Sequence, residues 1–471
     1  MKAFRRVLRA RTVREAIQQV PDVFYERFAV VALAYWLIVP LPLWWWGLSV
    51  GLPVSFLARV DLQVGIAAVV LALLVLAARW ARADLPGERD VLRDNIPLLL
   101  FGAFSALALT AAILRPTPET WSGDGYRHES IFTYLSYVGF FFLASQVFSS
   151  RRRRFVVGLV LGLVLVSCVV TLVSVTANAA PTENTSQLRH VKAYFEQFNH
   201  YGYLLAVGAA LAAAGTLVAR SRLARSGSLA IFAITLLTLL FNDTLGASVA
   251  LAVGVLGLVV WLATMGRLRA RRTAALVAVA ISVHLVAEFA GAGILNALIS
   301  LGADVGKLSA GGEDAGSAGT GRWELWVATI ERIAADPWLG HGVEGIAAGL
   351  PGTTGRSHNE YLQYAAFFGV PALLAYLGAI GAITVRVVRR GRAVDDVTVC
   401  AAIGAATYLV SACFGNTMYY TAPVLFLLLG IVWSGVRLRG EAPARSDKQR
   451  ASQVSHWSQE TQDSQKTQTA R

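Results

Sequence analysis

Charged side chains are scarce in this sequence, and their scarcity excludes most soluble proteins. Only 15% of its 471 residues are Asp, Glu, Lys or Arg, against roughly 25% in an average soluble domain, while 55% are hydrophobic. This composition excludes a cytosolic enzyme and a disordered chain. It predicts an all-α polytopic membrane protein, because a helix needs about 20 predominantly apolar residues to cross a bilayer.

Cysteine is rare as well, and several familiar catalytic motifs are missing. Cys168, Cys400 and Cys413 each lie within an apolar run, so we expect neither structural disulfides nor a cysteine metal site. The sequence has no phosphate-binding Gly-rich loop with Lys-Ser or Lys-Thr, no HExxH pair and no outward carboxylate pair at metal-binding spacing. An ATP-driven pump, a zinc protease and a metal-dependent glycosyltransferase are therefore disfavoured, and we predict no metal and no cofactor.

The basic residues, which give a formal net charge of +13, lie between the apolar runs. A nucleic-acid partner would require a solvent-facing basic patch, so we predict none. About twelve runs have spanning length, and the short run 229–242 could instead form a broken pair with 246–265 around Asn242, Asp243 and Thr244. The runs are 28–48, 62–80, 96–114, 130–148, 155–176, 200–219, 229–242, 246–265, 273–291, 363–385, 397–415 and 421–436.

The distribution of positive charge predicts the orientation of these spans. With the N-terminus inside, the cytoplasmic segments hold 33 of the 42 Lys and Arg residues, so both termini are predicted to be cytoplasmic. These basic segments could also bind anionic membrane lipids or a partner. We expect a cytoplasmic amphipathic segment at 1–27, a transmembrane catalytic domain at 28–436 and a disordered cytoplasmic tail at 437–471. The first segment lacks the short apolar region of a removable signal peptide.

The first long outward loop, at about 177–200, carries basic and polar side chains just before a span. They are Arg189, Lys192, Asn199 and His200. Positive charge on this side is not explained by the rules of membrane insertion. A guanidinium group matches phosphate oxygens, so Arg189, together with Arg322 in the next long loop, is predicted to clamp a diphosphate.

The second long outward loop, at about 292–362, exceeds the length expected of an unstructured connection. Apolar residues at near-helical spacing, Trp326 among them, predict an amphipathic helix at 322–335 on the membrane surface, and Pro337 prevents its continuation. The preceding stretch, 302–321, is rich in Gly, Ser and Ala and is predicted to be a mobile flap that admits a large substrate.

Polar groups gather where this loop enters the next span, at a predicted helix entrance. They are Arg356, His358, Asn359, Tyr361 and Gln363. Free backbone N–H groups at such an entrance favour an anion, and polar groups at this depth are costly unless they line a wet cavity. We interpret the group as a site, although a histidine there could equally be a structural hydrogen-bond partner.

The remaining outward arginines have a simpler interpretation. Arg59, Arg115 and Arg332 are predicted to extend to lipid phosphates, because a long basic side chain can keep its charged end at the membrane surface. His284 lies inside a span and is interpreted as an interhelical hydrogen-bonding residue.

Three stretches of the sequence contain most of the candidate residues: RHVKAYFEQFNHYG at 189–202, GRWELWVATIERIAADPWLGHGVEG at 321–345 and SHNEYLQYAAFFGVPALLAYLG at 357–378. With twelve spans and a late outward loop, they resemble the O-antigen ligase and polymerase superfamily of membrane glycosyltransferases. The resemblance implies a GT-C-like fold with a large helical periplasmic loop between spans 9 and 10, in the bacterial inner membrane. Residues 242–246 depart from it, because they lack an arginine that relatives often have there.

The resemblance also implies a reaction, the transfer of a glycan from undecaprenyl diphosphate to a sugar hydroxyl of lipid A-core in lipopolysaccharide assembly. His358 would be the general base, and Arg189 and Arg322 would hold the diphosphate without a metal, with inversion at the anomeric carbon. The expected substrate-binding residues are Lys192, Asn199, His200, Trp326, Arg356, Asn359, Tyr361 and Gln363.

Other functions fit the same residues. An O-antigen or exopolysaccharide polymerase and a pilin or protein O-oligosaccharyltransferase would share the diphosphate clamp and the base. A non-enzymatic transporter of lipid-linked glycan is the alternative from a different class.

Overall fold

A computed structural model describes most of the chain. The described residues are 12–39, 55–82, 88–123, 129–178, 198–290, 292, 302–303, 306–307, 309, 318–351, 355–416 and 421–437. The chain divides into two units, Met1–Gly435 and Val436–Arg471, and almost all of the second lies outside the described residues. The predicted disordered tail, most of the predicted flap and the residues Arg189 and Lys192 also lie outside them.

Every regular element among the described residues is a helix, so the predicted all-α class is confirmed. Among the described residues, a helix of at least 15 residues lies in all or part of each of the twelve apolar runs. These helices are α3 (Asp22–Ile38), α5 (Ser55–Arg82), α6 (Glu88–Leu114), α8 (Ile131–Ser145), α9 (Ser150–Asn178), α10 (Phe198–Val218), α11 (Arg222–Asn242), α12 (Leu245–Thr264), α13 (Ala270–Phe289), α18 (Val370–Arg390), α19 (Asp396–Ser411) and α20 (Ala422–Val436). The other helical elements are α2 (Val13–Gln18), α7 (Glu119–Ser122), α16 (Ala318–Ala335), η2 (Ala347–Gly349), α17 (Glu360–Phe368) and η3 (Gly391–Ala393).

The helices are those of a multi-pass membrane protein. Among the described residues, seven are long and apolar enough to cross a bilayer, in α6, α9, α10, α11, α12, α13 and α18. Shorter apolar helices lie in α5, α8, α19 and α20. The count of twelve spans therefore stays a prediction.

Two predicted spans differ from the structure. The run 229–242 is the second part of a complete helix, α11, which ends where Asp243 takes a left-handed backbone conformation (φ 58°). The broken-pair interpretation is therefore replaced by two separate helices. The predicted span 363–385 is divided into α17 and α18, because Gly369 has a φ of 86° and Pro371 lies in the first turn of the second helix.

Helix α10 is the most buried candidate span, with 94% of its apolar window inside the protein. Its sequence is rich in Ala and Gly, and small residues allow helices to approach closely. A Cβ added at Gly208 would lie 2.5 Å from Val164 of α9, and one at Gly215 would lie 2.6 Å from Ser228 of α11. The small residues of α10 therefore allow α9 and α11 to pack closely against it, and α10 lies inside the helix bundle.

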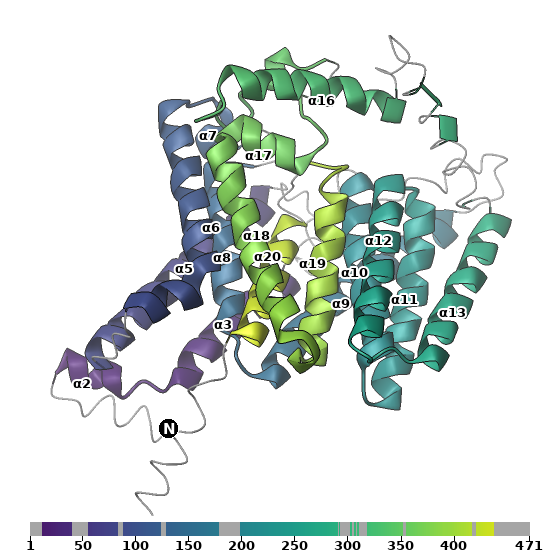
Figure 1. Ribbon diagram of the computed structural model, residues 1–471, viewed down its shortest axis with the longest axis horizontal. Coiled ribbons are helices and arrows are strands. Elements are labelled where there is room, and N and C mark those ends of the chain that lie inside the picture. The colour runs from purple at the N-terminus through teal and green to yellow at the C-terminus, as the bar shows by residue number, and fades with distance from the viewer. Residues whose placement is uncertain are drawn as a thin grey trace, which may run out of the picture. The chain divides into compact units, whose positions relative to one another are not determined.

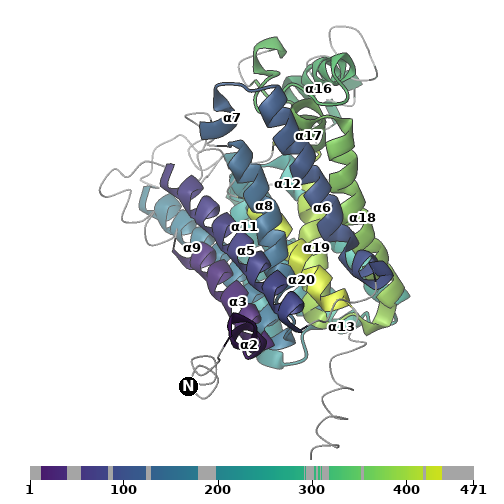
Figure 2. The same ribbon diagram turned by 90° about the vertical axis from the view of Figure 1, so that its left-hand side faces the viewer.

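The basic ends of the helices are held by acidic residues at one end of this unit. Arg153 donates to Asp395 at 2.7 Å, and Arg267 donates to Asp396 at 2.6 Å. Helix α16 lies across the opposite end, as Figure 1 shows, and Figure 2 views it nearly end-on with α2 at the far end. The arginine-rich segments thus share the side that the sequence predicts to be cytoplasmic.

Candidate active site

Helix α16 provides one wall of the candidate site. It covers the predicted helix 322–335 and begins four residues earlier, at Ala318, so the prediction of a helix here is confirmed. Thr329 and Leu325 are buried, whereas Trp323, Val327 and Ile330 form an exposed apolar stripe. The buried side of α16 packs against α17. The helical period places Arg322 and Trp326 on the same side as Thr329.

Arg322 lies within electrostatic range of the N-terminal turns of α10, because its charge acts on the Tyr203 hydroxyl. The Tyr203 hydroxyl in turn donates a hydrogen bond to the carbonyl oxygen of Phe414 at 2.8 Å. His200 is buried, and its ring packs edge-on against Tyr203 with centroids 6.0 Å apart. Arg322 and His200 therefore approach the same tyrosine.

His358 lies just before α17 in a strained backbone conformation, with a φ of 49°. Its backbone N–H donates to Oδ1 of Asn416 at 2.8 Å. Asn416 is two residues after Phe414, and two residues span at most about 7 Å. The groups around Arg322 and His358 therefore converge on the same short segment, 414–416, which follows α19.

Three other predicted substrate-binding residues make contacts within the protein. Asn359 is the N-cap of α17, and its side-chain oxygen accepts from the N–H groups of Tyr361 at 3.0 Å and Leu362 at 3.1 Å. The Tyr361 hydroxyl donates to the Leu409 carbonyl oxygen at 2.6 Å. Gln363 is fully buried, and its amide nitrogen donates to the Tyr134 hydroxyl at 3.0 Å. The predicted helix entrance is confirmed, and these side chains hold it in place.

The turn between α11 and α12 packs against the start of α10. The Asn242 amide nitrogen donates to the Phe198 carbonyl oxygen at 2.8 Å, and the Thr244 hydroxyl donates to Asn199 at 3.4 Å. Gly202 permits this contact, because a Cβ there would lie 2.4 Å from Asn242. The turn between α11 and α12 is thus adjacent to the start of α10, where Asn199 and His200 lie.

Arg356 lies in a buried charge cluster, which differs from its expected contact with substrate. Its side chain is 0% exposed, and its two terminal nitrogens form ion pairs with Glu129 and Glu344. The hydroxyls of Tyr137 and Tyr134 also donate to Glu129, at 3.3 and 3.5 Å. With both nitrogens on carboxylates, Arg356 is held inside the protein rather than presented to a phosphate.

A second buried carboxylate, Glu360, was missed by sequence reasoning. It is 1% exposed and accepts hydrogen bonds from Tyr408 at 2.9 Å and Tyr376 at 3.2 Å. Burial raises the pKa of Glu360 to about 7 from an ordinary value of 4.5. The sequence offered a signal for both acidic residues. Glu360 lies inside the His-Asn-Glu-Tyr run, and Glu344 lies near the end of the stretch 321–345. Glu129 carried no such signal.

Two arginines expected to extend to lipid phosphates instead contact the protein. Arg115 donates to Asp336 at 3.0 Å. The Arg332 guanidinium lies against Gly349, where an added Cβ would be 2.0 Å from it. The side chain of Arg59 lies outside the described part of the structure, so its contact with lipid stays a prediction.

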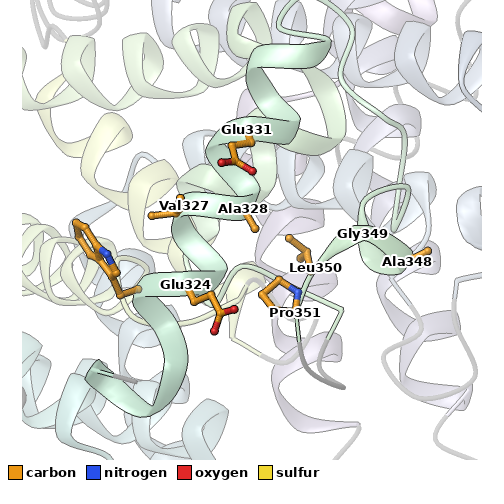
Figure 3. A pocket seen from close by; sticks show the side chains of 9 residues that line it. Glu324, Val327, Ala328, Glu331, Ala348, Gly349, Leu350 and Pro351 are labelled. Carbon is orange, nitrogen blue, oxygen red and sulfur yellow. The ribbon is translucent and has the colours of Figure 1, made fainter. Parts of the chain in front are cut away.

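An open groove lies on the exposed side of α16. Figure 3 shows Glu324, Val327 and Glu331 on the helix opposite Leu350 and Pro351, around a volume of about 630 Å³. On the other side, the buried indole N–H of Trp326 has no hydrogen-bond partner among the described residues. A buried donor without a partner is uncommon, so this one is available to an oxygen of a ligand. No group of three or more His, Cys, Asp or Glu side chains suited to a metal occurs in the described part of the chain.

Comparison with known proteins agrees with this layout. A search of the curated proteins found no match. Residues 202–377 match the family model described as O-antigen ligase, a region that contains Arg322, Trp326 and His358. The match supports the resemblance inferred from the sequence: residues 202–377 are similar to the O-antigen ligase family, a family of ligase- and polymerase-type membrane glycosyltransferases.

Proposed function

We propose that this protein is an O-antigen ligase that transfers a glycan from undecaprenyl diphosphate to a sugar hydroxyl of lipid A-core. The observation that best supports the proposal is the convergence of Arg322 and His358 on the segment 414–416. Tyr203, on which the charge of Arg322 acts, donates to the Phe414 carbonyl oxygen, and the His358 backbone N–H donates to Asn416. The proposal is that this arrangement lets a cationic group and an imidazole act on one substrate.

The leaving group determines what the basic residues must do. The bond between the anomeric carbon and the diphosphate oxygen breaks, and undecaprenyl diphosphate leaves with the electron pair. Arg322 would stabilise that charge, and the Trp326 N–H would donate to a phosphate oxygen. Arg189 and Lys192 are proposed to complete the clamp from outside the described residues, and no metal is required.

The acceptor hydroxyl supplies the new bond. His358 would remove its proton as the hydroxyl oxygen attacks the anomeric carbon from the side opposite the diphosphate, which inverts the configuration there. A neutral imidazole with an ordinary pKa of about 6.5 suits this role near pH 7. The strained backbone at His358 also fits, because residues in rare conformations cluster at functional sites.

The other candidate residues support these groups. Asn199 and His200 are proposed to shape the substrate-facing end of α10, since both lie beside Tyr203 or the Asn242 turn. Asn359, Tyr361 and Gln363 are proposed to act through the contacts that hold α17. The site is proposed to face the periplasm from the bacterial inner membrane, with both termini in the cytoplasm and the lipid acceptor entering from the bilayer.

Reconstitution in lipid nanodiscs with a lipid-linked glycan and lipid A-core tests the proposal. His358→Gln should lower the transfer rate by about 10²- to 10⁴-fold, because a general base typically contributes that much, and should leave donor binding intact. Arg322→Gln should instead weaken donor binding. The matched control is His341→Gln, because His341 lies on the same loop and its Nε2 is 2.8 Å from the Arg332 carbonyl oxygen. Full transfer by His358→Gln would remove His358 from the mechanism.

The same assay separates the alternatives. Offering lipid A-core, a second lipid-linked glycan or a pilin peptide identifies the acceptor, and product from only the second or third would replace the ligase by a polymerase or a protein glycosyltransferase. A transporter would move the donor without joining it to any acceptor. Activity that survives a chelator supports the metal-independent clamp, and lost activity contradicts it.

A further inference from the structure

Three segments that are distant in sequence meet at Arg356. Glu129 lies two residues before the start of α8, Glu344 lies in the turn before η2, and Arg356 lies in the turn before α17. Glu129 and Arg356 are 0% exposed, and the Glu344 side chain is 7% exposed. One guanidinium thus joins two carboxylates out of contact with solvent.

Stability alone does not explain such a cluster. Removing charges from water is unfavourable, and well-packed apolar side chains of similar volume often serve as well or better. Two carboxylates on one guanidinium also leave an excess negative charge, which the Tyr134 and Tyr137 hydroxyls on Glu129 help to accommodate. A buried ionic group with fixed directions, however, can select one arrangement of the segments that carry it.

The arrangement that this cluster selects includes His358, two residues after Arg356. The Ser357 hydroxyl donates to the Asn359 carbonyl oxygen at 2.9 Å, and the Asn416 side chain accepts from the His358 N–H. The backbone is left-handed at both Glu344 (φ 60°) and His358 (φ 49°). Such conformations persist in non-glycine residues only where the surroundings impose them.

Glu344 is itself delivered by a fixed segment. The N–H of His341 donates to the Ala366 carbonyl oxygen at 2.8 Å, and the N–H of Gly342 donates to the Phe367 carbonyl oxygen at 3.0 Å. This segment is therefore attached to the C-terminal end of α17, whereas Arg356 precedes its N-terminal end. The ion pair between Arg356 and Glu344 thus ties both ends of α17 together.

We propose that Glu129, Arg356 and Glu344 form a positioning network that fixes the backbone at His358 and so directs its imidazole toward the acceptor hydroxyl. None of the three touches substrate. The inference rests on the proposed function in assigning His358 as the base. It goes beyond that function by giving Arg356 a role different from diphosphate binding.

Arg356→Lys tests the network because it keeps the charge but lacks the two separate terminal nitrogens, in a rigid fork, that pair with Glu129 and Glu344. A misplacement of about 1 Å can cost about 10²-fold in rate, so we expect kcat to fall by roughly 10- to 100-fold. The KM for the lipid-linked donor should stay within about twofold, because Arg356 does not touch the donor; a phosphate ligand would instead raise KM. Glu344→Gln removes the charge of the partner of Arg356 but keeps a hydrogen-bonding group. If Arg356→Lys does not fold, the same fall in kcat at unchanged KM is expected of Glu344→Gln, and its absence would overturn the network. Arg115→Lys is the matched control, because it makes the same change in the exposed pair with Asp336, and it should leave kcat unchanged.

A readout that does not depend on transfer separates the two proposals. Carbethoxylation of His358 by diethyl pyrocarbonate, followed by mass spectrometry of the intact folded variants, reports the environment of the imidazole. We expect its rate to change in Arg356→Lys and not in Arg115→Lys. If wild-type protein fails to transfer glycan while this change is seen, the proposed function fails and the network stands. If wild-type protein transfers glycan while folded Arg356→Lys keeps both kcat and the carbethoxylation rate, the network is overturned and the function stands.

Discussion

Replacing Glu360 by Gln should remove one pH-dependent component of stability. The Glu360 carboxyl is 1% exposed, and burial raises its pKa from 4.5 to about 7. Well below pH 4.5 the carboxyl is protonated in both the folded and the unfolded protein, so its burial does not lower the free energy of unfolding through ionisation. Between pH 4.5 and about 7 the unfolded protein releases this proton and the folded protein keeps it, so the free energy of unfolding falls across this window and stays at the lower value above it.

The size of the effect follows from the shift. One pKa unit corresponds to 1.36 kcal/mol, so the wild-type protein should lose about 3 kcal/mol between pH 4.5 and 7 through this group. Gln stays neutral and can both accept from and donate to the hydroxyls of Tyr376 and Tyr408, so Glu360→Gln should lack this loss. For a large chain about 2 °C accompanies each kcal/mol, which gives a difference of about 6 °C.

Thermal unfolding in detergent between pH 4 and 8 measures this difference. The wild-type and Glu360→Gln curves should approach each other below pH 4.5, separate between pH 4.5 and 7, and stay separated by a constant amount above pH 7, with the variant more stable there. Glu331→Gln is the control, because Glu331 is exposed on α16 and the change should leave the wild-type slope unaltered. Parallel curves for wild-type protein and Glu360→Gln would refute the assignment of a buried, late-ionising carboxyl.

Three further changes test local packing and capping by thermal unfolding. Gly208→Ala should cost about 1–3 kcal/mol by overpacking, because its Cβ would meet Val164 at 2.5 Å, whereas Gly162→Ala in open space should be neutral; equal effects would contradict the close helix contact. Asn359→Ala should lower the free energy of unfolding by about 1 kcal/mol through loss of the N-cap, and Asn359→Asp should keep most of that stability because a carboxylate also caps a helix. An Asp variant as unstable as the Ala variant would contradict the capping role. Tyr361→Phe should cost about 1 kcal/mol through its lost bond to the α19 backbone, and an unchanged midpoint would deny that bond.

Much of the fold followed from local patterns in the sequence. Helix α16 was predicted because its apolar residues recur at the helical period and Pro337 follows it. The Gly369-Val370-Pro371 sequence also indicates a break between two helices. The prediction missed it because the residues on both sides of the break are apolar and read as one continuous span. The burial of α10 could not be predicted, because each spanning run is apolar whether its neighbours are lipid or protein.

The site was predictable to the extent that its residues are neighbours in sequence. The helix entrance at Asn359 could be located because cap, histidine and helix lie together. The partners of Arg356 could not, since Glu129 is 227 residues away and only the packing of α8 brings it close. Arg356 was therefore assigned to the substrate from its charge and its position beside His358.

The position of α10 among its neighbours has a consequence for biosynthesis. As the chain leaves the ribosome, α10 is made long before α19, yet the two pack so closely that a Cβ on Gly404 would lie 2.9 Å from Leu211. Until α19 arrives, the small-residue surface of α10 is without one of its permanent neighbours. The segment 414–416 follows α19, so a nascent chain acquires competent site geometry only with its last helices. A nonsense mutation before α19 should accordingly yield a membrane-inserted but inactive product that quality-control proteases can recognise.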